Sequence, residues 1–283
     1  MLAWRRFRHK AGRSRFRVPL TWVRHGGLDP NDVFLASYPR SGSTWTRFVL
    51  YEILTGGFSS FDNINRGIPE VGMHWRGEPL LPGGGRLIKT HEPYRKEYRK
   101  AIYLVRDVRD VLFSQYSRER ELGIVYDDFD TYLVKFAQGK ISGFGAWQNH
   151  VARWLRSPLE ARGDLLVLRF EDMRKDMESA ITGMLEFLGI EAAPALVRTA
   201  IANNSLERMR EKETQSQTFR QSKVEEGRFV RKGSIGGWRE RLSAEQLRLF
   251  DAYAGDVFRR LGYPLGAEVA SARTQSPTGS LAG

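Results

Sequence analysis

A turn of small and polar residues, 38–44, joins an apolar run to a segment with helical apolar spacing. Gly42 lets the backbone approach a ligand, and Arg40 adds a fixed positive charge. Hydroxyl donors come from Ser41, Ser43 and Thr44. They lie beside the unpaired N–H groups of a helix start, where the helix dipole also favours an anion. The turn therefore predicts a site for phosphate or sulfate; a turn whose hydroxyls only cap the helix is the alternative.

This turn departs from the usual ATP-binding loop. The pattern G-x-x-x-x-G-K-[ST] requires a lysine before the hydroxyl residue, and here Gly42 precedes Ser43. A phosphotransferase that uses ATP and magnesium therefore remains only a second hypothesis.

Further basic side chains follow the next predicted strands. Lys89 and His91 lie at the end of the second strand, and Arg106 follows the third. Because the carboxyl ends of parallel strands form one crevice, we expect these side chains to converge with Arg40. Asp107 would then cap the next helix, and Ser114, about two turns along it, would reach a second phosphate group.

Apolar, β-rich runs alternate with helix-like segments along the chain. The predicted strands are 33–37, 86–89, 101–105 and 165–169. The predicted helices are 42–54, 107–120, 146–155, 175–188, 195–203 and 244–261. This alternation predicts the α/β class, with a P-loop-like parallel sheet flanked by helices on both faces in a single domain. Residues 58–85, rich in Gly and Pro, predict a long surface excursion that shapes a substrate pocket.

The 283 residues carry a formal charge of +12, five histidines and no cysteine, which excludes disulfides and thiolate metal sites. We expect a basic extension over 1–28, a catalytic domain over 29–265 and a disordered tail over 266–283. The extension interleaves aromatic and basic residues and would suit peripheral contact with an anionic membrane; a solvated extension is the alternative. No stretch reaches membrane-spanning length, and we expect a cytoplasmic protein. The five scattered histidines show no metal-binding spacing, so we expect no bound metal.

Four segments resemble one enzyme family. "YPRSGSTW", "LIKTHEP", "VRDVRDVLFSQY" and "FVRKGSIGGW" occur in the order found in the cytosolic-type sulfotransferases that use 3′-phosphoadenosine 5′-phosphosulfate (PAPS). "FDTYLVKFAQGK" and "WQNHVARW" are similar to that family's middle region. The matches extend from about residue 33 to 263.

The resemblance implies roles for individual residues. Residues Arg40, Ser41, Gly42, Ser43, Thr44 and Trp45 would bind the 5′-phosphosulfate, with Arg40 in place of the family's lysine and Trp45 beside the adenine. The 3′-phosphate would be bound by Arg106, Ser114, Arg231, Lys232 and Gly233. Lys89 and His91 match the catalytic segment. Phe170 stands where many relatives have tyrosine, and Ser205 lies near the expected nucleoside contact.

These residues suit transfer of a sulfuryl group to an acceptor hydroxyl or amine by in-line displacement. Arg40 and Lys89 would stabilise charge in the transition state, and His91 would accept the acceptor's proton. The acceptor would be a small molecule, a lipid or a glycan, not a nucleic acid. Its pocket would be lined by Trp75, Tyr94, Phe144 and Trp147. A third hypothesis is a nucleic-acid or membrane-surface binder, and the sequence leaves the oligomeric state open.

Overall fold

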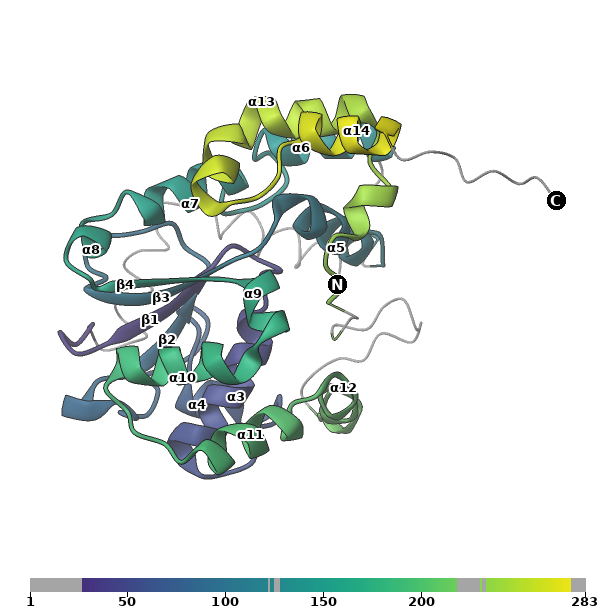
Figure 1. The fold of residues 1–283 in the computed structure, drawn as a ribbon. Coiled ribbons are helices and arrows are strands. Elements are labelled where there is room, and N and C mark those ends of the chain that lie inside the picture. The colour runs from purple at the N-terminus through teal and green to yellow at the C-terminus, as the bar shows by residue number, and fades with distance from the viewer. Residues whose placement is uncertain (1–26, 122, 125–127, 218–229, 231–232, 276–283) are drawn as a thin grey trace.

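The sheet contains four parallel strands in the order β2-β1-β3-β4 (Figure 1). The structure is a computed structural model that describes residues 27–121, 123–124, 128–217, 230 and 233–275. The strands are β1 (Val33–Ser37), β2 (Leu87–Thr90), β3 (Lys100–Val105) and β4 (Leu165–Arg169). The chain leaves β1 toward β2 and then returns to the other side of β1 to form β3. The loops after β1 and β3 therefore diverge, which opens a crevice at their carboxyl ends.

Both faces of the sheet are buried, as a parallel sheet between helical layers requires. Phe34 and Ala36 of β1 belong to one core cluster, whereas Val33 and Leu35 belong to the other. β3 alternates in the same way between the two clusters. The short apolar strands thus supply side chains to two cores.

Helices cover each face (Figure 1). One face is covered by α3 (Ser43–Thr55), α10 (Met177–Leu188) and α11 (Pro194–Asn203). The other is covered by α5 (Val108–Glu121), α6 (Phe129–Ala137), α7 (Trp147–Leu155) and α13 (Ala244–Leu261). The shorter elements are α4 (Ile64–Gly67), η1 (Pro82–Gly84), α8 (Pro158–Ala161), α9 (Phe170–Lys175), α12 (Leu206–Gln215), η3 (Gly237–Glu240) and α14 (Gly266–Gln275).

The predicted α/β class, the four parallel strands and the flanking helices are confirmed, with most element ends shifted by at most two residues. The prediction of disorder from residue 266 is wrong for α14. Asp251 accepts hydrogen bonds from the backbone N–H groups of Gly266 and Ala267 at 2.7 and 3.0 Å, and Val269 packs on the core. These contacts stabilise α14 although its sequence is only weakly apolar.

The excursion over 58–85 differs from a simple surface loop. It buries a row of apolar side chains: Phe61, Ile64, Ile68, Val71 and Leu81. The basic extension expected at the N-terminus lies outside the described residues, apart from its last two. Among the described helices, none is long and apolar enough to cross a membrane.

Candidate active site

The turn after β1 has a backbone shape that favours anion binding. Arg40 and Gly42 both adopt positive φ angles, 72° and 95°. A Cβ on Gly42 would lie 2.7 Å from the ring of Phe170, so a larger residue would not fit there. Within the described part of the chain, the buried hydroxyl of Ser41 has no hydrogen-bond partner. A turn with a donor left unsatisfied and no side chain in the way is a suitable cradle for an oxyanion.

Arg106 crosses the crevice between β1 and β3. Its Nη1 donates to the backbone oxygen of Arg40 at 3.0 Å, and its Nη2 donates to that of Ser234 at 2.8 Å. Its buried Nε has no partner among the described residues, and its guanidinium lies 4.6 Å from the centre of the Phe170 ring. Burial lowers the pKa of Arg106, and neighbouring carboxylates oppose this effect. A partly satisfied buried cation is ready for an anionic ligand.

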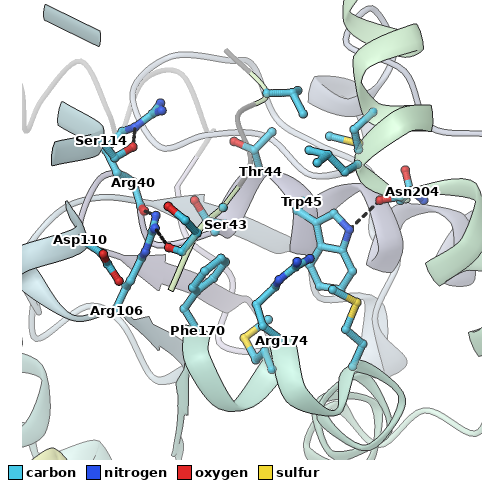
Figure 2. Close-up of a pocket in the computed structure, with 18 of the residues that line it drawn as sticks. Arg40, Ser43, Thr44, Trp45, Arg106, Asp110, Ser114, Phe170, Arg174 and Asn204 are labelled. Atoms are coloured by element: carbon cyan, nitrogen blue, oxygen red, sulfur yellow. Dashed lines mark hydrogen bonds between the residues drawn. The ribbon is translucent and has the colours of Figure 1, made fainter. Parts of the chain in front are cut away.

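Ser114 of α5 completes this side of the pocket. Arg40 Nε donates to Ser114 Oγ at 2.9 Å, so these side chains lie together although they are far apart in the sequence. Figure 2 shows Arg40, Ser114 and Arg106 grouped on one side of the pocket. The predicted helix cap is also present, because Asp107 Oδ1 accepts from the backbone N–H of Arg109 at 3.0 Å.

The segment after residue 232 is held against α5. Asp110 Oδ2 accepts from the backbone N–H of Gly236 at 2.7 Å. The fully buried Arg109 pairs with Asp107 at 2.7 Å and stacks between Trp238 and Phe258, 3.6 and 4.6 Å from their ring centres. This cation–π arrangement fixes the loop that brings Gly233 to the pocket.

Lys89 lies in β2 with its side chain almost fully buried. Its Nζ donates to Glu70 Oε2 at 3.0 Å. Burial lowers the pKa of Lys89, although Glu70 acts in the opposite direction. Burial would raise the pKa of Glu70, but the positive charges of Lys89 and Arg47 and the hydrogen bond from Lys89 outweigh it, so that pKa is lowered. The short Nζ–Oε2 distance and the opposing effect of each group on the pKa of the other are those of a buried ion pair.

The contacts of His91 define its tautomer. Its Nδ1 lies 2.8 Å from the backbone oxygen of Ser37, and because a carbonyl only accepts, Nδ1 carries the proton. Nε2 of the neutral ring then keeps its lone pair. Burial and the charge of Lys89 lower the pKa of His91 to about 3. At neutral pH the ring is therefore a proton acceptor through Nε2.

A second histidine supports the backbone at this point. His150 Nε2 donates to the backbone oxygen of His91 at 3.0 Å, and Tyr103 Oη donates to His150 Nδ1 at 2.9 Å. All of His150 is buried, and burial lowers its pKa to about 4. This chain of neutral hydrogen bonds links the middle of β3 to the end of β2.

The opposite side of the pocket is built from helices. Trp45 of α3 donates from Nε1 to the backbone oxygen of Asn204 at 2.7 Å (Figure 2). Asn204 is held in turn by Lys212, which donates to its Oδ1 at 2.7 Å and to Glu52 at 2.8 Å. Ser205 accepts from the backbone N–H of Arg208 and so caps α12. The indole is thus fixed by a buried polar cluster.

One cavity of about 920 Å³ unites these features. Its lining includes most of the residues predicted from the sequence: Arg40, Gly42, Ser43, Thr44, Trp45, Lys89, His91, Arg106, Ser114, Phe170, Ser205 and Gly233. Ser41 is buried in the turn and does not line the cavity. Arg231 and Lys232 lie outside the described residues. The predicted convergence of strand-end cations on one crevice is therefore observed.

The four aromatics predicted to line an acceptor pocket do not form one group. Phe144 lies 5.8 Å from His91 between ring centres. Trp147 is buried in the core against Phe258, Tyr94 packs edge-on to Trp154, and Trp75 is largely exposed. Phe144 is thus the one of the four that lies beside the ring of His91.

Several residues at the site were not predicted from the sequence. Glu70 contacts Lys89, and Asn204 contacts Trp45. Both contacts join segments that are distant in the sequence, so no local sequence pattern predicts them. Asp110 could have been identified, because it repeats the Arg-Asp pair of "VRDVRD" one helical turn later. In the part of the chain that the structure describes, no group of three or more acidic or histidine side chains is arranged to hold a metal ion.

Known proteins are similar to this chain in sequence. Residues 83–262, well over half of the chain, match the family described as Sulfotransferase domain. Over 249 residues the chain is 29% identical to Sulfotransferase 1A1 of Mus musculus, covering 79% of this chain and 83% of that protein. It is 27% identical over 257 residues to Sulfotransferase 2A6 of Mus musculus, covering 83% and 86%.

Solved structures show the same fold. A crystal structure of mouse sulfotransferase SULT7A1 complexed with PAP aligns with a TM-score of 0.66 at 21% identity, over 89% of this chain and 93% of that one. Retinol dehydratase in a complex with retinol and PAP aligns with a TM-score of 0.66 at 20% identity, over 86% of each chain. The arrangement of strands and helices is therefore that of these proteins.

Proposed function

The chain belongs to the sulfotransferase domain family, and from this premise we propose that it transfers a sulfuryl group from PAPS to an acceptor hydroxyl or amine, with His91 as general base. The observation that carries the proposal is the single cavity in which Arg40, Arg106, Lys89 and His91 meet. Two similar folds were solved with PAP, adenosine 3′,5′-bisphosphate, which is the product left by PAPS.

The residues of the cavity fit this co-substrate. The Cβ-free space at Gly42, with Ser43 and Thr44 lining the cavity beside it, suits the 5′-phosphosulfate, and a contact from Ser41 stays a prediction. The orphaned Nε of Arg106, with Ser114 beside it, suits the 3′-phosphate. Trp45, supported by Asn204, offers an aromatic face for adenine. We expect Arg231 and Lys232 to add charge at the 3′-phosphate.

When bound, PAPS supplies an activated sulfuryl group with the 5′-phosphate as leaving group. Lys89 and the backbone N–H groups of the turn then stabilise negative charge that grows on the leaving side. His91 Nε2 accepts the proton of the acceptor hydroxyl as that oxygen bonds to sulfur. Because Lys89 is held by Glu70 and the N–H groups by the turn before the reaction, little reorganisation is needed.

The acceptor is a small molecule, a lipid or a glycan in this proposal. Of the four aromatic side chains expected to contact the acceptor, Phe144 is the one that lies beside His91. The cytoplasmic location and the membrane contact of the N-terminal extension stay predictions. The third hypothesis, nucleic-acid or membrane-surface binding, rests on that extension and is not favoured by the cavity.

Calorimetry and labelled-sulfate transfer test the proposal. We expect PAP to bind without metal, and labelled sulfate to pass from PAPS to at least one member of a mixture of phenols, sterols and sugars. Binding of ATP with magnesium, together with no binding of PAP, would instead support the phosphotransferase.

A further inference from the structure

Glu70 is held beside Lys89 by the backbone as well as by charge. Residue 70 forms an isolated parallel bridge with Lys89. Lys89 N donates to Pro69 O at 2.8 Å, and Val71 N donates to Lys89 O at 2.8 Å. These two bonds flank Glu70 and bring its carboxylate to 3.0 Å from Nζ of Lys89. The ion pair is therefore prepared by the fold and does not depend on flexible side chains finding each other.

The surroundings of this pair are strongly cationic. Arg47 of α3 is buried and donates to Asn65 Oδ1 at 2.8 Å and to the backbone oxygen of Ile68. Its charge bears on Lys89 and on Glu70, and Arg40 also repels the Lys89 ammonium. Burial lowers the pKa of Arg47 to about 10, and Glu70 opposes that shift. Glu70 is thus the carboxylate whose charge acts on two buried cations.

Two imidazoles complete the set of titratable groups around the pair. His91 is neutral and feels both Lys89 and Glu70. His74 Nδ1 accepts from the backbone N–H of Glu70 at 3.1 Å, so this nitrogen is unprotonated. An imidazole is either neutral or cationic, so neither ring can supply a negative counter-charge for Lys89. Without Glu70, the ammonium would lie buried among arginines.

We propose that Glu70 is a positioning residue for sulfuryl transfer, which holds Lys89 protonated and directed into the cavity beside His91. The inference rests on the proposed function, because it assigns Lys89 a part in the reaction. If Glu70 formed only a structural ion pair, its removal would lower stability alone. In the proposed role, its removal also changes kcat and the pH dependence of kcat.

The test compares Glu70→Gln with Glu78→Gln, the same change on the same segment. Release of labelled sulfate from PAPS to water serves as the activity probe, since it needs no identified acceptor. For Glu70→Gln we expect kcat to fall roughly tenfold to hundredfold, while the Kd of PAP changes less than about threefold. Glu78→Gln should behave as the native enzyme.

A second measurement does not depend on activity. NMR titration of lysine ε-carbons in the protein without donor gives the Lys89 midpoint, identified by the signal missing in Lys89→Met. We expect Glu70→Gln to lower this midpoint by about one pH unit or more, and the alkaline limb of kcat to move down with it. In Glu70→Asp, which keeps the carboxylate, both the Lys89 midpoint and the alkaline limb of kcat should lie between those of the native enzyme and of Glu70→Gln.

The outcomes separate the two proposals. If Lys89→Met keeps near-native sulfate release, the part that Lys89 plays in the proposed function is wrong. If Lys89→Met abolishes release but Glu70→Gln leaves kcat within about twofold and the midpoint unmoved, only the positioning role is overturned. A lower melting temperature with unchanged kcat and pH profile would also overturn it and leave a structural ion pair.

Discussion

The two walls of the cavity are built differently. One wall consists of strand ends and the turns after them, and it presents charged or polar groups: Arg40, Lys89, His91 and Arg106. The other wall consists of helices and presents mainly apolar side chains, with Trp45, Met173, Ile201 and Met209 among them. Figure 2 shows Trp45 and Asn204 on the side opposite Arg40 and Arg106.

The difference between the walls suggests that the strand wall serves the reaction and the helical wall serves binding. The side chains of the strand wall have fixed partners: Ser37 O for His91, Arg40 O for Arg106 and Glu70 for Lys89. Fixed, desolvated charges are effective in a transition state because they need no rearrangement. The helical wall offers area and one aromatic face, which contribute to ground-state binding. Substitutions on the two walls should therefore separate kcat from binding.

The largest effect is expected for His91→Ala. Loss of the Nε2 lone pair should lower kcat for a hydroxyl acceptor by roughly 100-fold to 10,000-fold. PAP affinity, measured by calorimetry, should stay within about threefold because the ring is not a phosphate ligand in the proposed function. Near-native turnover of this variant would show that His91 is not the base.

Arg106→Ala should produce the opposite pattern. Removing the guanidinium deletes a charge-assisted contact to the 3′-phosphate and frees the backbone oxygens of Arg40 and Ser234. We expect the Kd of PAP to rise roughly tenfold to hundredfold. A saturated kcat that falls more steeply than affinity would contradict the assignment of Arg106 to binding.

Gly42→Ala tests the shape of the turn itself. Positive φ and the Phe170 ring at 2.7 Å both oppose a Cβ, so we expect weaker PAP binding and a loss of about 1–3 kcal/mol in the free energy of unfolding. Gly56→Ala is the matched control, because Gly56 also has a positive φ, 68°, but an added methyl group there would meet no described atom within 4 Å. Equal losses in the two variants would mean that the Phe170 contact is unimportant.

The smallest effect concerns stability against pH. The pKa of His150 is about 4 in the folded chain and about 6.5 when unfolded, so the unfolded state binds the extra proton first as pH falls. Its contribution to stability is complete above pH 6.5 and is lost between pH 6.5 and 4. Denaturant unfolding should show a shallower decline over this range in His150→Asn. If the free energy of unfolding fell equally steeply with pH in His150→Asn, a group other than His150 would cause the decline.

The sequence predicted the strand wall better than the helical wall. Strand ends are marked by apolar runs, and the parallel topology then forces Arg40, Lys89 and Arg106 together. Helix α6 was not predicted, although the sequence contains a capping residue and helical apolar spacing there. Asp128 caps the helix, and Tyr132, Leu133 and Phe136 share its buried face. The contacts between Glu70 and Lys89 and between Trp45 and Asn204 join distant segments, so no window of sequence contains them.

The position of β1 in the middle of the sheet affects how the chain is made. β1 leaves the ribosome before either neighbour, and its partners in β2 and β3 are synthesised only after the whole excursion has emerged. Its backbone edges therefore stay unpaired and its apolar side chains stay uncovered during that interval, which makes the nascent chain prone to aggregate. We expect the anion-binding turn to take shape late in translation, once β3 has docked and Arg106 has reached the backbone of Arg40.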